Sequence, residues 1–152
     1  MKTTDENIIV SQMFSVSKSE LWSVITSHEH MIHWFFEDIP SFKAEIGFKT
    51  KFNVKAPSQD FMHLWEITQL IPENEIVYNW RYEGLKGNAF VTFQLESIKK
   101  ETQLIVTVKT VEDFDTTIPE FKRESCQQGW EYFIQQRLVT YITIFNKKHL
   151  CH

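Results

Sequence analysis

WEYFIQQRLVTYITIF, residues 130–145, is the stretch of this chain that decides its fold. Its apolar residues recur every three or four positions, the spacing that places side chains on one face of an α-helix. One charged residue, Arg137, falls on the same face. We therefore expect a long amphipathic helix that buries this face against another layer of the protein. The apolar members of the face are Trp130, Phe133, Ile134, Leu138, Tyr141, Ile142 and Phe145.

The residues before this helix alternate between apolar and polar side chains, the period of two that indicates half-buried β-strands. Phe48, Phe52 and Val54, for example, lie on one side of such a pattern. Short connections between the apolar runs predict antiparallel pairing. We expect strands at residues 8–16, 48–54, 61–71, 76–82, 91–95 and 104–108.

Two short helices are expected between the first two strands. Ser17 or Ser19 is placed to cap the first, and Ser27 the second, which would run from His28 to about Phe35. The resulting order predicts an α+β fold in which a curved antiparallel sheet wraps around the C-terminal helix. The chain has 152 residues and shows neither repeat nor linker, which predicts one domain over residues 1–152 with a tail from about 147.

Composition narrows the function classes. The net charge of −4 argues against nucleic acid, because phosphate binding needs a basic surface. No apolar run approaches the ~20 residues that span a bilayer, and the polar first residues do not resemble a signal peptide. Only two cysteines are present, which is too few for a disulfide framework. We expect a protein of a reducing cytoplasm that neither binds nucleic acid nor inserts into membranes.

Four motifs follow one another along the chain, at residues 17–22, at Trp34, at residues 76–80 after Pro72, and at residues 91–93 and 102–104 together with Gly129-Trp130. In this order they resemble the helix-grip fold of the START/Bet v 1-like (SRPBCC) superfamily. Within it, the chain is similar to the family homologous to the activator of the heat-shock protein 90 ATPase. The family often has paired glycines before the second strand, where this chain has only Gly47. The resemblance implies a pocket for apolar or amphipathic small molecules between sheet and helix, or a role as an enzyme or chaperone partner.

Aromatic residues make up 14% of the chain, with 13 phenylalanines and 5 tryptophans. Rings in this number fit either a completely filled core or the walls of an apolar pocket. We expect a cavity whose lining follows from strand parity and the helix face, with a filled core as the alternative. The candidate lining comprises Phe48, Phe52, Trp65, Ile67, Tyr78, Trp80, Tyr82, Phe93, Val106, Val108, Trp130, Phe133, Arg137 and Tyr141.

Arg137 is the candidate for the polar end of a ligand, because a guanidinium binds a carboxylate or phosphate through paired hydrogen bonds. The alternatives are that its stem covers apolar surface with the charge in water, or that it pairs with an acid such as Glu66. Tyr78, Tyr82 and Tyr141 carry hydroxyls that could orient a ligand or simply bond to backbone or water.

The histidines at 28, 30 and 33 invite a metal interpretation, but they do not have the zinc-protease spacing and no third ligand shares a face with His30 and His33. The cluster of His149, Cys151 and His152 lies in the expected tail. We therefore predict neither a metal site nor a cofactor.

No phosphate-binding loop, nucleophile elbow or dinucleotide fingerprint is present, and we assign no catalytic residue. Cys126 lies on the apolar face of the helix as a small core residue.

Our first hypothesis is a cavity that binds a small apolar or amphipathic molecule, and the second is a module that contacts a chaperone or another protein. An acid–base enzyme is the third, and it would need His63 or Glu66 buried in the pocket. His63 shares the parity of Trp65, which directs it inward, with a place at the rim as the alternative.

Overall fold

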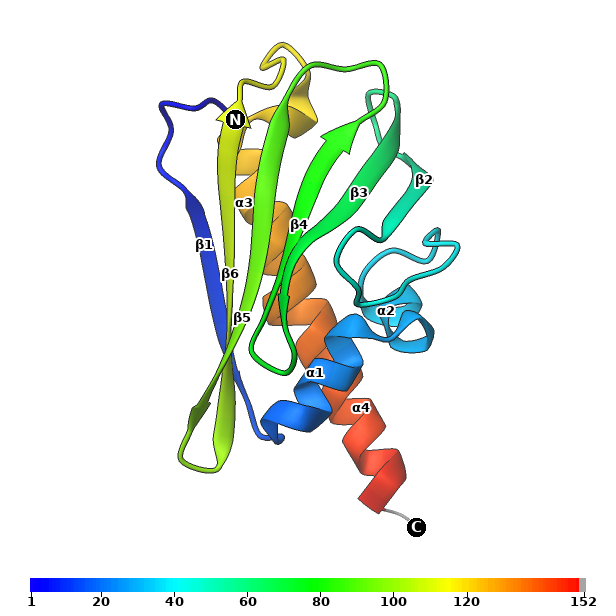
Figure 1. Ribbon diagram of the computed structural model, residues 1–152, viewed down its shortest axis with the longest axis vertical. Helices are drawn as coiled ribbons and strands as arrows, with labels where there is room; N and C mark the ends of the chain where they lie inside the picture. Colours follow the sequence, from blue (N-terminus) through cyan, green and yellow to red (C-terminus); the bar gives the residue numbers. More distant parts are fainter. Residues whose placement is uncertain (151–152) are drawn as a thin grey trace.

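The computed structural model describes the backbone of residues 1–150 and the side chains of residues 1–146. One antiparallel six-stranded sheet holds the C-terminal helix against one face, and two short helices lie beside it near one end of the sheet (Figure 1). The elements are β1 (Ile8–Phe14), α1 (Lys18–Thr26), α2 (His28–Trp34), β2 (Lys49–Lys55), β3 (Asp60–Ile71), β4 (Glu75–Tyr82), β5 (Asn88–Ile98), β6 (Glu101–Glu112), a 3-10 turn η1 (Pro119–Phe121), α3 (Arg123–Glu131), a π-helical segment η2 (Tyr132–Arg137) and α4 (Leu138–Leu150).

The strand order is β1-β6-β5-β4-β3-β2, and every neighbouring pair is antiparallel. This arrangement confirms the predicted α+β helix-grip fold. β5 and β6 are longer than expected at both ends, and at one end they form a hairpin that projects from the sheet beside the helices (Figure 1). Apolar periodicity marks only the part of each strand that faces the helix, so the projecting part gave no such signal.

The two short helices begin where the sequence predicts. Ser17 caps α1, since its hydroxyl oxygen accepts a hydrogen bond from the Glu20 amide at 3.1 Å. Ser27 is the residue before α2, but its side chain makes no capping bond. The Trp34 indole donates to the Val24 carbonyl at 3.0 Å and so joins α2 to α1.

The C-terminal helix departs from a regular α-helix over η2, which the 3.6-residue pattern did not predict. Its most buried side chains follow a spacing of four, at Trp130, Ile134, Leu138 and Ile142. Arg137 lies beside this row and is only partly buried. The helix continues to Leu150, beyond the expected start of the tail. The side chains of His149, Cys151 and His152 lie outside the described residues.

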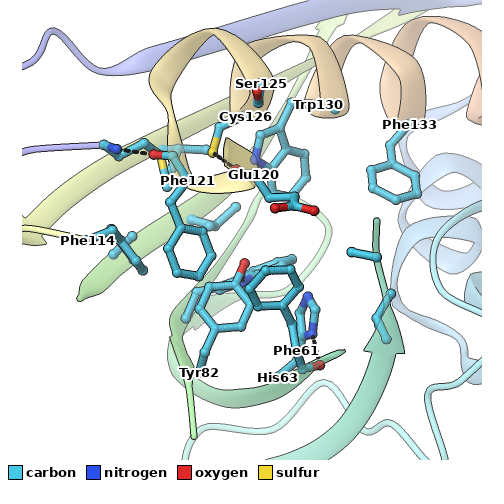
Figure 2. Close-up of a pocket in the computed structure, with 18 of the residues that line it drawn as sticks. Phe61, His63, Tyr82, Phe114, Glu120, Phe121, Ser125, Cys126, Trp130 and Phe133 are labelled. Carbon is cyan, nitrogen blue, oxygen red and sulfur yellow. Dashed lines mark hydrogen bonds between the residues drawn. The ribbon is translucent and has the colours of Figure 1, made fainter. Parts of the chain in front are cut away.

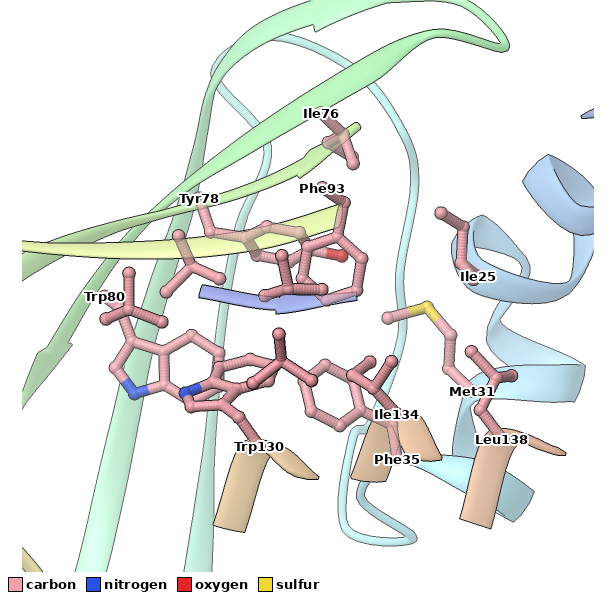
Figure 3. Packing of buried hydrophobic residues seen from close by; sticks show 14 of the residues in the cluster. Ile25, Met31, Phe35, Ile76, Tyr78, Trp80, Phe93, Trp130, Ile134 and Leu138 are labelled. Carbon is pink, nitrogen blue, oxygen red and sulfur yellow. The ribbon is translucent and has the colours of Figure 1, made fainter. Parts of the chain in front are cut away.

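Phe35 and Phe36, which directly follow α2, enter the space between the sheet and the C-terminal helix. The Phe35 ring is 2% exposed, and its centroid lies 5.4 Å from that of Trp65 on β3 and 5.7 Å from that of Trp130 on α3. Figure 3 shows it beside Trp130 and Ile134, on the helix side of Tyr78 and Phe93. The core between sheet and helix is therefore filled here from a third segment.

The loop after β4 contains a glycine that a larger residue cannot replace. Gly87 has φ +119, and a Cβ there would overlap the buried ring of Phe114. Gly84, in the same loop, has φ +75, but no atom lies within 4 Å of its Cβ position. The two glycines thus share a left-handed backbone and differ in steric contact.

We expect Gly87→Ala to lower the free energy of unfolding by about 3 kcal/mol, because backbone strain and overpacking against Phe114 act together. Gly84→Ala, which carries only the strain, should cost about 1 kcal/mol. Urea denaturation of both variants measures the difference. Equal losses would contradict the role of Phe114.

Candidate ligand-binding cavity

A cavity of about 260 Å³ lies between α3 and the inner face of the sheet. Figure 2 shows the helix carrying Ser125, Cys126 and Trp130 over the space, with Tyr82, His63 and Phe61 below it. Most of its lining is aromatic or aliphatic. The lining residues are Met1, Phe36, Val54, Ala56, Phe61, His63, Trp80, Tyr82, Ala89, Val91, Val108, Phe114, Glu120, Phe121, Ser125, Cys126, Gly129, Trp130 and Phe133.

Gly129 is the helix residue above the cavity that leaves this space open. It is in α3, one turn after Ser125 and Cys126 and one turn before Phe133, all of which line the cavity. Apart from its chain neighbours and the backbone of its own helix, no atom lies within 4 Å of the position that its Cβ would take. A glycine inside a helix costs about 1 kcal/mol relative to alanine. At Gly129, the missing side chain leaves space that belongs to the cavity.

His63 is the buried titratable group of the cavity wall. The residue is 5% exposed, and its Nδ1 lies 3.1 Å from the Phe61 carbonyl oxygen. Since a carbonyl only accepts, Nδ1 is the ring nitrogen that carries the proton, which leaves Nε2 as an acceptor. Burial lowers the pKa of His63 to about 4, so the imidazole is neutral at physiological pH.

Tyr82 lies beside His63 on the neighbouring strand of the sheet. The two residues are directly paired in the β3–β4 register, and their ring centroids are 4.8 Å apart at 76°. The Tyr82 hydroxyl oxygen accepts a hydrogen bond from Trp80 Nε1 at 2.9 Å. Burial raises the pKa of Tyr82, which keeps its hydroxyl protonated and able to donate.

Cys126 and Glu120 occupy the helix side of the cavity. The Cys126 thiol donates to the Glu120 carbonyl at 3.3 Å, and burial raises its pKa to about 11. A thiol in this state is a weak nucleophile. The Glu120 carboxylate accepts from the Ser58 side chain and from its amide at 3.1 Å. These bonds lower the pKa of Glu120 and keep a negative charge at the cavity edge.

Five residues of the predicted lining line this cavity: Trp80, Tyr82, Val108, Trp130 and Phe133. Most of the other strand residues in the predicted set are buried in the core, where Phe35 and Phe36 pack against Phe52, Trp65 and Phe93, and Phe42 stacks on Tyr78. These core residues are Phe52, Trp65, Ile67, Tyr78, Phe93 and Val106, with Phe48 partly buried against them.

Arg137 and Tyr141 lie elsewhere, in a groove between α2 and the C-terminal helix. Arg137 Nη2 donates to the His33 carbonyl at 2.6 Å, and Glu66 lies 3.7 Å from Lys49 Nζ instead. Arg137 therefore neither reaches the cavity nor pairs with Glu66. It was misplaced because the buried row advances by four residues, which leaves position 137 at the side of the helix.

The histidines of α2 have separate partners. His28 Nε2 lies 2.6 Å from the Ile39 carbonyl, and His30 Nδ1 lies 2.6 Å from the Tyr141 hydroxyl. The ring of His33 stacks on Tyr141 at 5.9 Å. Their ring nitrogens are therefore not gathered around one point. Among the described residues, no helix combines the length and hydropathy that crossing a bilayer requires.

Two groups of residues are among the lining that sequence reasoning missed. Phe61, Ala89 and Val91 share strand parity with residues that were predicted to face inward, so the pattern could have identified them. Phe36, Phe114 and Phe121 come from connecting segments without periodicity, and nothing in the sequence places them at the cavity.

The buried state of His63 predicts a pH-dependent stability. On unfolding, its pKa returns from about 4 to 6.5, so the unfolded chain binds more protons between these values. We expect His63 to lower the free energy of unfolding by on the order of 3 kcal/mol as the pH falls from 6.5 to 4. Above that window it should have no effect on stability.

Urea denaturation between pH 7.5 and 4 measures this loss. His63→Gln should flatten the pH dependence within the window, whereas His33→Gln, at an exposed position, should retain the wild-type slope. The same slope in wild type and His63→Gln would show that His63 is not the group responsible.

Comparison with known proteins agrees with this architecture. The family model described as Activator of Hsp90 ATPase homolog 1-like protein matches residues 15–143. A human relative, Activator of 90 kDa heat shock protein ATPase homolog 1, is 29% identical over 128 residues, which are 83% of this chain and 34% of that protein. The chain thus spans about a third of this curated relative.

Solved structures share the fold at lower identity. CV1439 from Chromobacterium violaceum has a TM-score of 0.72 at 18% identity, over 88% of this chain and 94% of that one. The Aha1 dimer from Colwellia psychrerythraea gives 0.62 at 18%, over 85% and 90%. DynU16, described as a protein in the dynemicin biosynthetic locus, gives 0.73 at 18%, over 91% of this chain but 48% of that one. Because the family model matches most of the length of this chain, the chain belongs to the Activator of Hsp90 ATPase homolog 1-like family.

Proposed function

We propose that the protein binds a small apolar or amphipathic molecule in the cavity beneath α3. The observation that carries this proposal is the open space under Gly129, where a helix that would be more stable with a side chain has none. Rings on the sheet and the helix surround this space, and a few polar groups lie in its wall, those of His63 and Tyr82 on the sheet side and those of Glu120, Ser125 and Cys126 on the helix side. Ligand pockets combine an apolar lining with few polar groups in this way.

The size of the cavity limits the ligand. A volume of about 260 Å³ exceeds the ~150 Å³ of an engineered cavity that holds benzene, and it lies just below the ~300 Å³ at which drug-sized sites begin. A bicyclic ring system or a short acyl chain fits these limits.

Two cysteines without a disulfide framework support a reducing cytoplasm as the place where binding occurs.

The chemistry of the wall favours holding a ligand over transforming it. A general base works best when its pKa is near the working pH, whereas burial holds the pKa of His63 near 4. Cys126, with a pKa of about 11, is similarly unsuited to attack. Glu66, the other candidate for acid–base chemistry, is exposed on the outer face of the sheet beside Lys49.

Filling the cavity from Gly129 tests the proposal. We expect Gly129→Leu to weaken the binding of naphthalene at least tenfold, because the new side chain takes the space beneath the helix. It should not unfold the protein, since leucine favours a helix over glycine by about 0.8 kcal/mol. Fluorescence titration gives the affinity, and urea denaturation gives the stability.

Gly129→Ala is the matched control. This substitution stabilises the helix to a similar extent but adds only one methyl group. Naphthalene should therefore still bind with an affinity within about threefold of the wild type. Unchanged binding to Gly129→Leu, or none to the wild type, would count against the cavity as the binding site.

Contact with a chaperone is a second candidate function, in keeping with the name of the human relative. The observation that favours it is the groove on the outer side of the C-terminal helix, where Tyr132 and Ile144 are 46% and 50% exposed. Arg137 lies between them in the same groove. Exposed apolar and arginine side chains together are typical of protein contacts.

We expect that, if this surface docks such a partner, the protein will stimulate the ATPase of a 90 kDa heat-shock protein and the double variant Tyr132→Ala, Ile144→Ser will not. Ile9→Ser, at an equally exposed apolar residue on β1, should keep the stimulation. A steady-state ATPase assay measures it, and the lack of any effect by the wild type would exclude this function for the partner tested.

A further inference from the structure

We propose that the cavity selects a neutral ligand whose polar head is a hydroxyl group, which donates a hydrogen bond to Nε2 of His63 and accepts one from the hydroxyl of Tyr82. This inference rests on the proposed function and specifies the class of ligand that the same cavity takes: a small phenol or alcohol with an apolar body.

The two polar groups act at one place. His63 and Tyr82 are opposite each other on β3 and β4, and their rings meet edge to face at 4.8 Å. Figure 2 shows the upper ring nitrogen of His63 and the hydroxyl of Tyr82 both pointing toward the space beneath α3. They are therefore placed to engage a single head group.

The hydrogen bonds of both residues leave complementary groups for a ligand. Nδ1 of His63 donates to Phe61, and among the described residues no donor is bonded to Nε2 although the residue is 5% exposed. The oxygen of Tyr82 already accepts from Trp80, which leaves its O–H free to donate. On the sheet side, one acceptor and one donor thus face the cavity, and an acceptor that faces a largely apolar space favours a ligand that supplies its donor.

A hydroxyl matches this pair better than other common head groups do. Its single oxygen both donates and accepts, so the two cavity groups satisfy it. A ketone only accepts and would leave Nε2 unmatched. An amide places more hydrogen-bonding sites in the cavity than the two groups can satisfy, and the rest of the lining is largely apolar.

Charge disfavours a carboxylate or a phosphate. Among the described residues, no lysine or arginine side chain lines the cavity, and the ammonium of Met1, which does line it, is bonded to the Phe121 carbonyl. Glu120 adds a negative charge at its edge, and an anion moved into an apolar space needs a paired cation. The low pKa of His63 and the raised pKa of Tyr82 keep both groups neutral around pH 7. The head group expected from Arg137 therefore differs from the one that this cavity accepts.

Three probes that share one bicyclic ring test the preference for a hydroxyl head group: naphthalene, 2-naphthol and 2-naphthoate. We expect the wild type to bind 2-naphthol about tenfold more tightly than naphthalene and to bind 2-naphthoate the most weakly. Tyr82→Phe should abolish the preference for 2-naphthol over naphthalene, a change of about tenfold in their relative affinities, or about 1.4 kcal/mol. Tyr78→Phe, at a buried tyrosine outside the cavity lining, is the matched control and should bind all three like the wild type.

A second measurement does not depend on the folding of a variant. The ¹⁵N resonance of Nε2 in His63 should shift when 2-naphthol is added to the wild type, because the nitrogen then accepts a hydrogen bond, and should stay nearly unchanged with naphthalene. Equal affinities for naphthalene and 2-naphthol, or tighter binding of 2-naphthoate, would overturn the hydroxyl preference and leave the cavity as a binding site. Failure of all three to bind would overturn both proposals.

Discussion

The insertion of the Phe35 ring between the sheet and the C-terminal helix is the constraint on which the rest of the structure depends. The ring contacts Trp65 and Trp80 on the sheet and Trp130 on the helix, with centroids 5.4 to 6.1 Å apart. Aromatic rings bury large areas and pack best edge to face or offset. A side chain in this position sets the distance between the two layers, so the helix cannot approach the sheet closely along its length. Phe36, the next residue, then separates this filled core from the open space under α3.

The pairing of β3 with β4 brings the chemistry to that open space. His63 pairs with Tyr82, and Trp65 with Trp80, so alternate residues of both strands point inward together. A slip of one residue would turn all of them to the outer face, so the buried tryptophans hold His63 and Tyr82 inside. The same residues that pack the core therefore fix the polar groups of the cavity. The hydrogen bond from Trp80 to the Tyr82 hydroxyl joins the two roles directly.

Sequence periodicity predicted what depends on local pattern and missed what depends on a third segment. The strands, the Ser17 cap and the inward direction of Trp80, Tyr82 and Val108 follow from periods of two and from helix signals, whereas Ser27 makes no capping bond. Phe36, Phe114 and Phe121 come from connections, where no period indicates the direction of a side chain. The packing of Phe35 against Trp65 and Phe93 could not be foreseen for the same reason, and it places these two residues in the core instead of the predicted cavity. Arg137 was misplaced because a stripe with a period of 3.6 includes position 137, whereas the buried row advances by four.

Gly129 connects the stability of the protein with its proposed function. A chain with 13 phenylalanines and 5 tryptophans has the means to fill the space beneath α3, and close packing is the ordinary state of a protein interior. Leaving the space open sacrifices dispersion contacts along its walls, and the glycine above it weakens the helix as well. Both costs fall on the same end of the molecule, whereas the other end is packed around Phe35. Natural proteins depart from the most stable arrangement mainly at functional sites. The uneven filling of one continuous interior is therefore the strongest physical argument that the α3 end is where this protein meets its ligand.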